Sequence, residues 1–378
     1  CLVCKTSLSQ AGESKEVEFF QAIINSKSRL TYERVAEQMK INKFSDPYAQ
    51  SLKNLVDIYK ILKKAKKNRG ALELDIPFYV PQLKGNKIEK FINTSRNEAH
   101  LLIEECMLLA NICAAKILMK AKIPSIYRIH PKPDPLKIKN LEGFARSRKI
   151  NVTLGNDGKV KELSNLVDIT KDRKDKETIH MQILQSLSLA VYETEVSEHF
   201  ALGYPAYTHF TSPIRRYPDL MVHRALKSLI QTSSNGKISL NKIRPQPINK
   251  DLYPYNNDLV EEIASLSSTK EREAEKAERE AINYLKCAYA KDNIGKEFNG
   301  VISGVTNFGL FIHLDSIHIE GLCHIKHLPR REYYEFDENS KMLKSTSSNH
   351  CYSLGDSLLV KIKDADLTTQ RIDIEIVK

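Results

Sequence analysis

The chain has 378 residues, enough for about two or three domains. Hydrophobic residues make up 41% of it and charged residues 28%, which supplies a sizeable core and excludes a fibrous or broadly disordered protein. Lysines and arginines outnumber aspartates and glutamates by 58 to 47. The resulting net charge of +11 favours a polyanionic partner, with nucleic acid ahead of an anionic membrane surface.

Cysteine usage favours a reducing compartment. The seven cysteines are odd in number and scattered, which is not the pattern of a disulfide framework, so we expect a cytoplasmic protein. Cys1 and Cys4 form an isolated C-x-x-C pair, and a zinc site would need a second pair that the sequence lacks. No apolar run approaches the ~18 residues of a membrane-spanning helix, so we expect no membrane partner.

Helical periodicity dominates the chain before about residue 290. The run of cations at residues 63–69, followed by Gly70, predicts a helix C-terminus. Residues 72–80 are predicted to form a short strand or loop, and residues 231–256, which carry Ser, Asn and Pro, a surface loop. Apolar residues recur at helical spacing, and predict helices, within residues 30–65, 94–121, 141–148, 179–192 and 259–286.

Short alternating β-rich runs replace this periodicity after about residue 290. Five such runs separated by turn signals in under ninety residues predict a small closed barrel of the OB type. The fold class is therefore α+β, with a largely helical first part and a five-stranded barrel after a boundary near residue 290. The predicted strands are residues 298–303, 309–314, 321–325, 357–362 and 372–377.

Aromatic residues in the predicted barrel indicate nucleic-acid binding. Phe308, Phe311 and His324 can lie on one outer face, where flat rings stack with single-stranded bases. Lys363 can add a phosphate contact. The alternative is that both phenylalanines belong to the barrel core, but residues three apart cannot both point inward on a regular strand.

The densest motif spans residues 199–224. Its Thr-Ser-Pro sequence at residues 211–213 predicts a helix start, with Arg215 and Arg216 in the first turns. Cations oppose the dipole at a helix N-terminus, so two arginines there favour an anion such as phosphate as ligand. The alternative is a pair of structural salt bridges, with Asp219 as one partner.

Asp219 and His223 are four residues apart on the predicted helix, a spacing that two ligands of one metal ion can share. We expect instead that Asp219, in this context, anchors an arginine or a cap. No metal-ligating residue is therefore assigned.

The string His-Phe-Thr-Ser-Pro-Ile-Arg-Arg-Tyr-Pro-Asp-Leu at residues 209–220 resembles the signature of the ribonuclease II (RNB) family. Residues 28–32, 96–111 and 127–130 agree with the same family. Residues 294–378 resemble the RNA-binding domain named after the ribosomal protein S-one, with a longer insertion at 329–353. The resemblance therefore covers the chain from its first residue to its last.

This resemblance implies a processive 3′→5′ exoribonuclease that cuts single-stranded RNA to nucleoside 5′-monophosphates. Water attacks the phosphodiester with the help of Mg²⁺ held by carboxylates, and an arginine stabilises the developing charge. It implies an RNB catalytic domain over residues 1–290 and an RNA-binding domain over residues 291–378, in a monomer. By motif position the catalytic residues are Arg215, Arg216 and Glu278, and Phe19 and Tyr217 bind RNA.

The sequence departs from the family in one respect. The family holds its metal on an Asp cluster of the form D-x-x-D-x-D-D, and this sequence contains no such cluster. The chain also begins with Cys1 rather than Met. We expect it to be the C-terminal part of a longer ribonuclease, and the alternative function is an RNA-binding fragment without hydrolytic activity.

Overall fold

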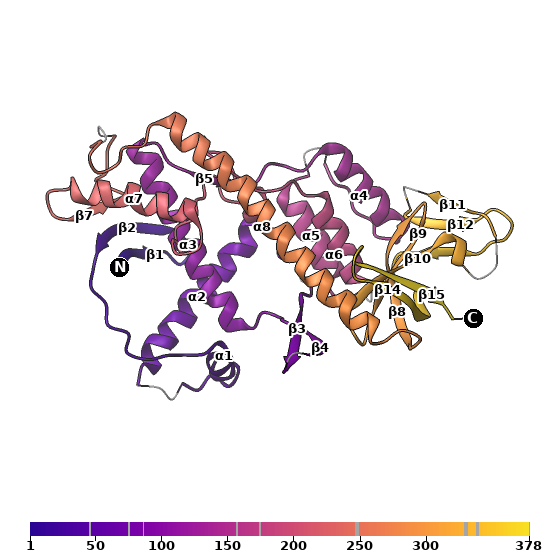
Figure 1. Cartoon of the computed structure of the whole chain (residues 1–378). Helices are drawn as coiled ribbons and strands as arrows, with labels where there is room; N and C mark the ends of the chain where they lie inside the picture. Colours follow the sequence, from indigo (N-terminus) through magenta and orange to yellow (C-terminus); the bar gives the residue numbers. More distant parts are fainter. Residues whose placement is uncertain are drawn as a thin grey trace. The chain divides into compact units, whose positions relative to one another are not determined.

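The computed structural model describes residues 1–44, 47–74, 76–85, 87–155, 158–173, 175–245, 249–328, 332–337 and 340–377 (Figure 1). The chain forms two compact units, each assembled from separate stretches. The first comprises Cys1–Leu72, Arg96–Lys132 and Ser188–Arg272, and the second Glu73–Ser95, Pro133–Leu187 and Glu273–Lys378. Both combine helices with strands, which confirms the predicted α+β class.

A three-stranded antiparallel sheet opens the first unit. Strands β1 (Leu2–Leu8) and β2 (Ser14–Gln21) form a hairpin, and β7 (Lys237–Ser239) pairs with the other edge of β2. In β2 the apolar residues Val17 and Phe19 alternate with polar ones and are completely buried. Sequence periodicity missed this sheet, because β7 is too short to stand out in the loop predicted at residues 231–256.

Helices supply most of the first unit. Helix α2 ends at Arg69 as predicted, and Gly70 closes it in the left-handed region at φ 72°. Asn97 caps the start of α3 by accepting hydrogen bonds from the backbone of Ala99 and His100. Apart from the three-stranded sheet, the elements of this unit are α1 (Tyr32–Ile41), α2 (Ala49–Arg69), α3 (Glu98–Ala121), β5 (Tyr127–Ile129), β6 (Val191–Glu193), η1 (Phe200–Leu202), α7 (Tyr217–Gln231) and α8 (Asn257–Lys291) as far as Arg272.

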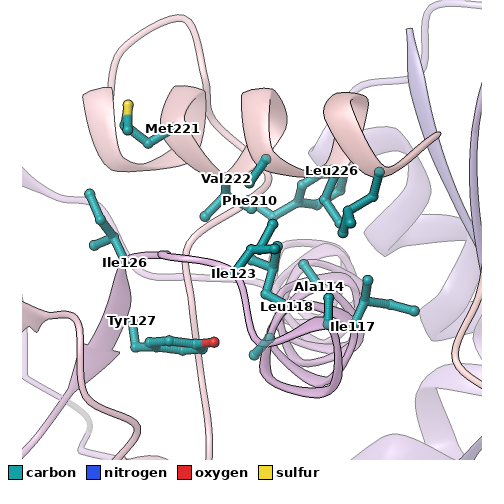
Figure 2. Packing of buried hydrophobic residues seen from close by; sticks show 14 of the residues in the cluster. Ala114, Ile117, Leu118, Ile123, Ile126, Tyr127, Phe210, Met221, Val222 and Leu226 are labelled. Carbon is teal, nitrogen blue, oxygen red and sulfur yellow. The ribbon is translucent and has the colours of Figure 1, made fainter. Parts of the chain in front are cut away.

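The core of the first unit lies between α3 and α7. Figure 2 shows Val222 and Leu226 of α7 above Ala114 and Leu118 of α3, with Phe210 beside them. Small residues in α3 let the two helices approach closely, since residues 113–115 are Cys-Ala-Ala and all are completely buried. This packing fixes the segment that leads into α7.

Besides a hairpin and a barrel, the second unit contains helices, among them the part of α8 that begins at Glu273. The hairpin pairs β3 (Tyr79–Lys84) with β4 (Lys87–Asn93), and it overlaps the short strand or loop predicted at residues 72–80 only at Tyr79 and Val80. Helices α4 (Pro135–Ser147), α5 (Val160–Thr170) and α6 (Lys176–Ser186) follow. The helix predicted over residues 179–192 is too long, because Leu187 turns to an extended conformation and β6 begins at Val191.

The predicted five-stranded barrel is confirmed. It closes in the order β10-β15-β14-β8-β9, and residues Leu310, Ile312 and Leu314 of β9 alternate inward and are completely buried. The insertion before β14 forms a small sheet, β11-β12-β13, that sequence patterns did not reveal. The strands are β8 (Glu297–Thr306), β9 (Gly309–Leu314), β10 (Ile319–His324), β11 (Tyr334–Asp337), β12 (Met342–Ser345), β13 (Cys351–Ser353), β14 (Ser357–Asp366) and β15 (Arg371–Ile376).

Gly309 is required where β9 meets β10. A Cβ at this position would lie 2.4 Å from the carbonyl oxygen of Cys323, and backbone cannot move aside as a side chain would. We expect Gly309→Ala to lower the free energy of unfolding by about 1–3 kcal/mol, the usual cost of overpacking. Thermal melting measures this change.

Gly143→Ala is the matched control, since a Cβ there meets nothing within 4 Å and the residue lies inside α4. This variant should be neutral or slightly more stable, because alanine favours helix more than glycine does. Equal melting temperatures for the two variants would contradict the close approach of β9 and β10.

Within the described ranges, no helix is both long and apolar enough to cross a membrane.

Candidate functional site

The last residue of α2 holds the beginning of the motif. Arg69 donates a hydrogen bond from Nε to the carbonyl oxygen of Leu202 at 2.9 Å, and its guanidinium lies 4.2 Å from the ring centroid of Tyr204. Gly203 has a φ of 66°, and a Cβ there would lie 3.2 Å from the carbonyl oxygen of Arg69. Glycine therefore lets the motif pack directly against the helix end.

A buried amide on α3 holds the middle of the motif. Asn111 donates from Nδ2 to the hydroxyl of Tyr207 at 2.7 Å and accepts from the backbone N–H of Phe210 at 2.9 Å. Thr208 donates its hydroxyl to the carbonyl oxygen of Ile126 at 2.6 Å. These bonds satisfy polar groups inside the core, so they fix the path of the backbone as well as stabilising it.

Aromatic rings and an arginine surround this segment. The ring centroid of His209 lies 5.6 Å from that of Tyr192 and 5.6 Å from that of Tyr207. Arg128 places its guanidinium 4.5 Å from the Tyr192 ring centroid and pairs with Glu271 at 2.6 Å. Sequence analysis placed Tyr207 and His209 in the motif but assigned no role to Arg128, Tyr192 or Glu271, which come from separate stretches of the chain.

Two histidines next to Tyr207, His209 and His199, are neutral; the ring centroid of His199 lies 5.3 Å from that of Tyr207. Burial, reinforced by the guanidinium groups of Arg216 and Arg128, lowers the pKa of His209 to about 2. Burial and the neighbouring His130 lower the pKa of His199 to about 3. Both imidazoles therefore act at neutral pH as ring surfaces and hydrogen-bonding groups, and not as cations.

The helix predicted to start at the Thr-Ser-Pro sequence begins later. Helix α7 starts at Tyr217, with Arg216 as its N-cap, and the preceding residues form a turn in which the N–H of Arg216 bonds to the carbonyl oxygen of Ser212 at 3.0 Å. The backbone N–H of Ser212 donates to the carboxylate of Asp219 at 2.7 Å. The turn is not continuous with α7, because Arg216 between them takes an extended conformation at φ −121° and ψ 119°.

Arg216 and Asp219 form a two-point ion pair. Arg216 Nη2 lies 2.8 Å from Asp219 Oδ1, and Arg216 Nε lies 2.8 Å from Oδ2. Asp219 is completely buried, and the guanidinium compensates the cost of removing its charge from water. Asp219 thus anchors an arginine, as expected. The pair is the structural salt bridge that the alternative interpretation expected for Arg216, and it engages Nε and Nη2 of the guanidinium.

Arg215 differs from its neighbour. Its side chain is exposed, and within the described part of the chain no hydrogen bond or ion pair engages the guanidinium. Ile214 beside it is fully exposed, and Tyr217 is 49% exposed. The turn thus presents one cation and two apolar groups outward. A free guanidinium on a rigid turn is suited to bind a phosphate through two hydrogen bonds.

Two other predicted site residues, Phe19 and Glu278, come from outside this motif. Phe19 is completely buried and packs edge-on against Phe210, with ring centroids 5.4 Å apart, so it cannot stack on RNA bases without leaving the core. Alternation along β2 explains this burial, since Phe19 shares the inner face with Val17. Glu278 lies exposed on α8, in the part that belongs to the second unit.

The barrel brings three of its predicted residues together. Phe308, Phe311 and His324 line one pocket of about 600 Å³. Phe308 sits in the turn before β9 and is 44% exposed, while Phe311 points outward from β9, so neither belongs to the barrel core. Lys363 does not line this pocket. The cations that do line the pocket are Lys286 of α8 and Arg371 of β15, and sequence analysis missed both.

The described residues do not fit a magnesium ion. Among them, no three His, Cys, Asp or Glu side chains gather closely enough to hold a metal. The carboxylate of Asp219 is engaged by Arg216 and Ser212. His223 places Nε2 at 2.8 Å from the carbonyl oxygen of Phe210 and stacks on that ring.

The pocket aromatics should contribute to RNA affinity. We expect the double substitution Phe308→Ala and Phe311→Ala to weaken binding of single-stranded RNA by about 1–3 kcal/mol for each base that loses its stacking surface. Fluorescence anisotropy with a labelled oligoribonucleotide measures the change. Tyr333→Ala is the control, since that side chain is 85% exposed and lies outside the pocket. Equal losses in both variants would show that the pocket has no special role.

Fold and motif together define a member of a nuclease family. The RNB domain matches residues 1–232, and the chain belongs to the RNB family. The S1 RNA binding domain matches residues 291–377, which include the five barrel strands.

Several similar proteins are ribonucleases R. The chain is 37% identical to ribonuclease R of Vibrio parahaemolyticus over 387 residues, covering 100% of this chain and 45% of the relative. It is 34% identical to that of Escherichia coli K12, covering 100% and 46%. The chain thus spans about half the length of the curated relatives it matches. The apo structure of Mycoplasma genitalium RNase R superposes with a TM-score of 0.87 at 27% identity, covering 100% of this chain and 57% of that one.

A second structure of that protein, in complex with ribose-methylated single-stranded RNA, matches with the same TM-score of 0.87 and the same coverage.

Proposed function

We propose that the chain is a 3′→5′ exoribonuclease that hydrolyses single-stranded RNA to nucleoside 5′-monophosphates. Membership of the RNB family and the similarity to ribonuclease R support this activity. The observation that carries it is the exposed, unengaged guanidinium of Arg215, held on a turn that the Arg216–Asp219 ion pair makes rigid.

Hydrolysis of a phosphodiester places negative charge on the non-bridging oxygens as water attacks phosphorus. Arg215 would bind those oxygens through charge-assisted hydrogen bonds that strengthen as the charge grows. Arg216 acts through the turn and is a positioning residue. Tyr217, half exposed two residues from Arg215, would contact the sugar or base of the same nucleotide.

The remaining assignments follow the resemblance. RNA would enter past the barrel, where Phe308, Phe311 and His324 take bases, with Lys363 on a phosphate. Glu278 would act near the scissile bond. Residues 1–290 would form the catalytic domain and residues 291–378 the RNA-binding domain of a cytoplasmic monomer. Mg²⁺ belongs to the proposal only through the family, since the described side chains do not fit it.

RNA binding without hydrolysis is the second candidate function. This second function is favoured because the described residues bring together no group of side chains that could hold a metal ion. An arginine alone stabilises charge but does not deprotonate a water molecule.

One assay separates the two candidates. The purified chain is incubated with Mg²⁺ and a 5′-labelled single-stranded oligoribonucleotide, and the products are resolved at single-nucleotide resolution. A ladder that shortens from the 3′ end supports the exoribonuclease. RNA that is retarded in a native gel but remains uncut supports the binding function. Intact RNA that is not retarded would contradict both.

A further inference from the structure

The barrel pocket has one wall that does not come from the barrel. Asn283 and Lys286 of α8 line it together with Phe308, Phe311 and Glu320. Its volume of about 600 Å³ is in the range of small-molecule sites and is enough for a nucleoside. A helix that closes one side makes this a bounded pocket, in which the edge of a bound base meets side chains.

Glu320 is the unexpected member of this pocket. A carboxylate repels the phosphates of RNA, and at about 4 Å two unit charges near a protein surface interact by several kcal/mol. The hydroxyl of Ser303 donates a hydrogen bond to Glu320 Oε2, which orients the carboxylate. An oriented carboxylate beside aromatic rings is suited to accept hydrogen bonds from a base.

Lys286 supplies the complementary group. Its side chain is partly buried, and desolvation lowers the pKa of its ammonium group while the Glu320 carboxylate opposes that shift. The ammonium and the carboxylate therefore act on each other within one pocket. Because both residues line the pocket, they offer a bound base one hydrogen-bond donor and one acceptor with two oxygens.

The two phenylalanines supply the stacking surface. Their ring centroids are 6.0 Å apart and the planes stand at 86°, so one ring offers its face where the other offers its edge. A base lying on one of these faces turns its edge toward the pocket walls.

We propose that this pocket binds one nucleobase of single-stranded RNA and that Glu320 and Lys286 make it prefer guanine. The Watson–Crick edge of guanine has two adjacent donors, N1–H and the N2 amino group, beside the acceptor O6. The carboxylate accepts from both donors, and the ammonium donates to O6. Adenine, cytosine and uracil each lack the adjacent pair of donors. The inference rests on RNA binding by the barrel, which is part of the proposed function.

The test compares affinities of the full chain for four oligoribonucleotides of equal length: oligouridylate, and oligouridylates that carry a single G, A or C in the middle. We expect the oligouridylate that carries G to bind about tenfold more tightly than plain oligouridylate, which is the discrimination that one two-point base contact provides. Glu320→Gln should bring this ratio close to one, because the glutamine amide places a donor against a donor. Lys286→Met should also reduce it.

Glu335→Gln is the matched control, since Glu335 is exposed on β11 and lies outside the pocket; it should retain the full ratio. Equal binding of all four sequences by the unsubstituted chain would overturn the inference and leave RNA binding standing. Tighter binding of every sequence by Glu320→Gln, at an unchanged ratio, would overturn it too, since Glu320 would then only repel phosphate. An absence of binding to any sequence would overturn the proposed function itself.

Discussion

Arg215→Ala is expected to slow the release of 3′-terminal nucleotides by about 10²–10³-fold, the usual cost of removing one group that stabilises charge in the transition state. Arg215 is the exposed, unengaged cation of the turn, whereas the neighbouring Arg216 is held by Asp219. The measurement is the single-turnover rate at which a 5′-labelled oligoribonucleotide shortens.

Two controls accompany this variant. Its melting temperature should match that of the unsubstituted chain, because an exposed side chain without a partner contributes little to stability. Arg215→Lys keeps the charge but loses the planar two-point contact, so its rate should fall between the other two. If Arg215→Ala shortened RNA at the full rate, the phosphate would have to be bound elsewhere.

Arg216→Ala is expected to lower the free energy of unfolding by about 3 kcal/mol. The substitution leaves the carboxylate of Asp219 completely buried without its ion-pair partner, and an uncompensated buried charge is strongly destabilising. The midpoint of urea denaturation measures the effect.

Lys276→Ala is the matched control for this variant. Lys276 pairs with Glu280 at 3.8 Å on the surface of α8, where the side chains are 77% and 58% exposed, so breaking that pair should change stability little. If Arg216→Ala were no more destabilising than Lys276→Ala, the buried ion pair would not be what holds the turn. We thus expect the two substitutions to have different effects: Arg215→Ala lowers the rate of RNA shortening, and Arg216→Ala lowers the free energy of unfolding.

Local patterns determined much of the fold. The cations at the end of α2 and the Gly70 that closes it were evident in the sequence, because helix termination depends on neighbouring residues. The five barrel strands were evident for the same reason, since alternation and turn residues are local signals. The hairpin β3–β4 and the strands β11, β12 and β13 were missed, because short exposed strands alternate too weakly to be recognised.

The motif also shows the limit of local patterns. Its residue string was enough to indicate the RNB family and a phosphate site, but it presented Arg215 and Arg216 as equivalent. Their difference depends on where the buried carboxylate of Asp219 lies, which is decided by the packing of α7 against α3. The same packing buries Phe19 against Phe210, although the sequence allowed an exposed ring.

The sequence by itself thus determined the α+β class, the barrel, the family and the motif that carries Arg215. Only the tertiary structure decided which arginine is free, which aromatic rings are exposed, and that Lys286 and Glu320 share a pocket with Phe308 and Phe311. The physical reason is that burial and charge pairing depend on residues far apart in the chain, while helix caps, strand alternation and motif strings depend on near neighbours.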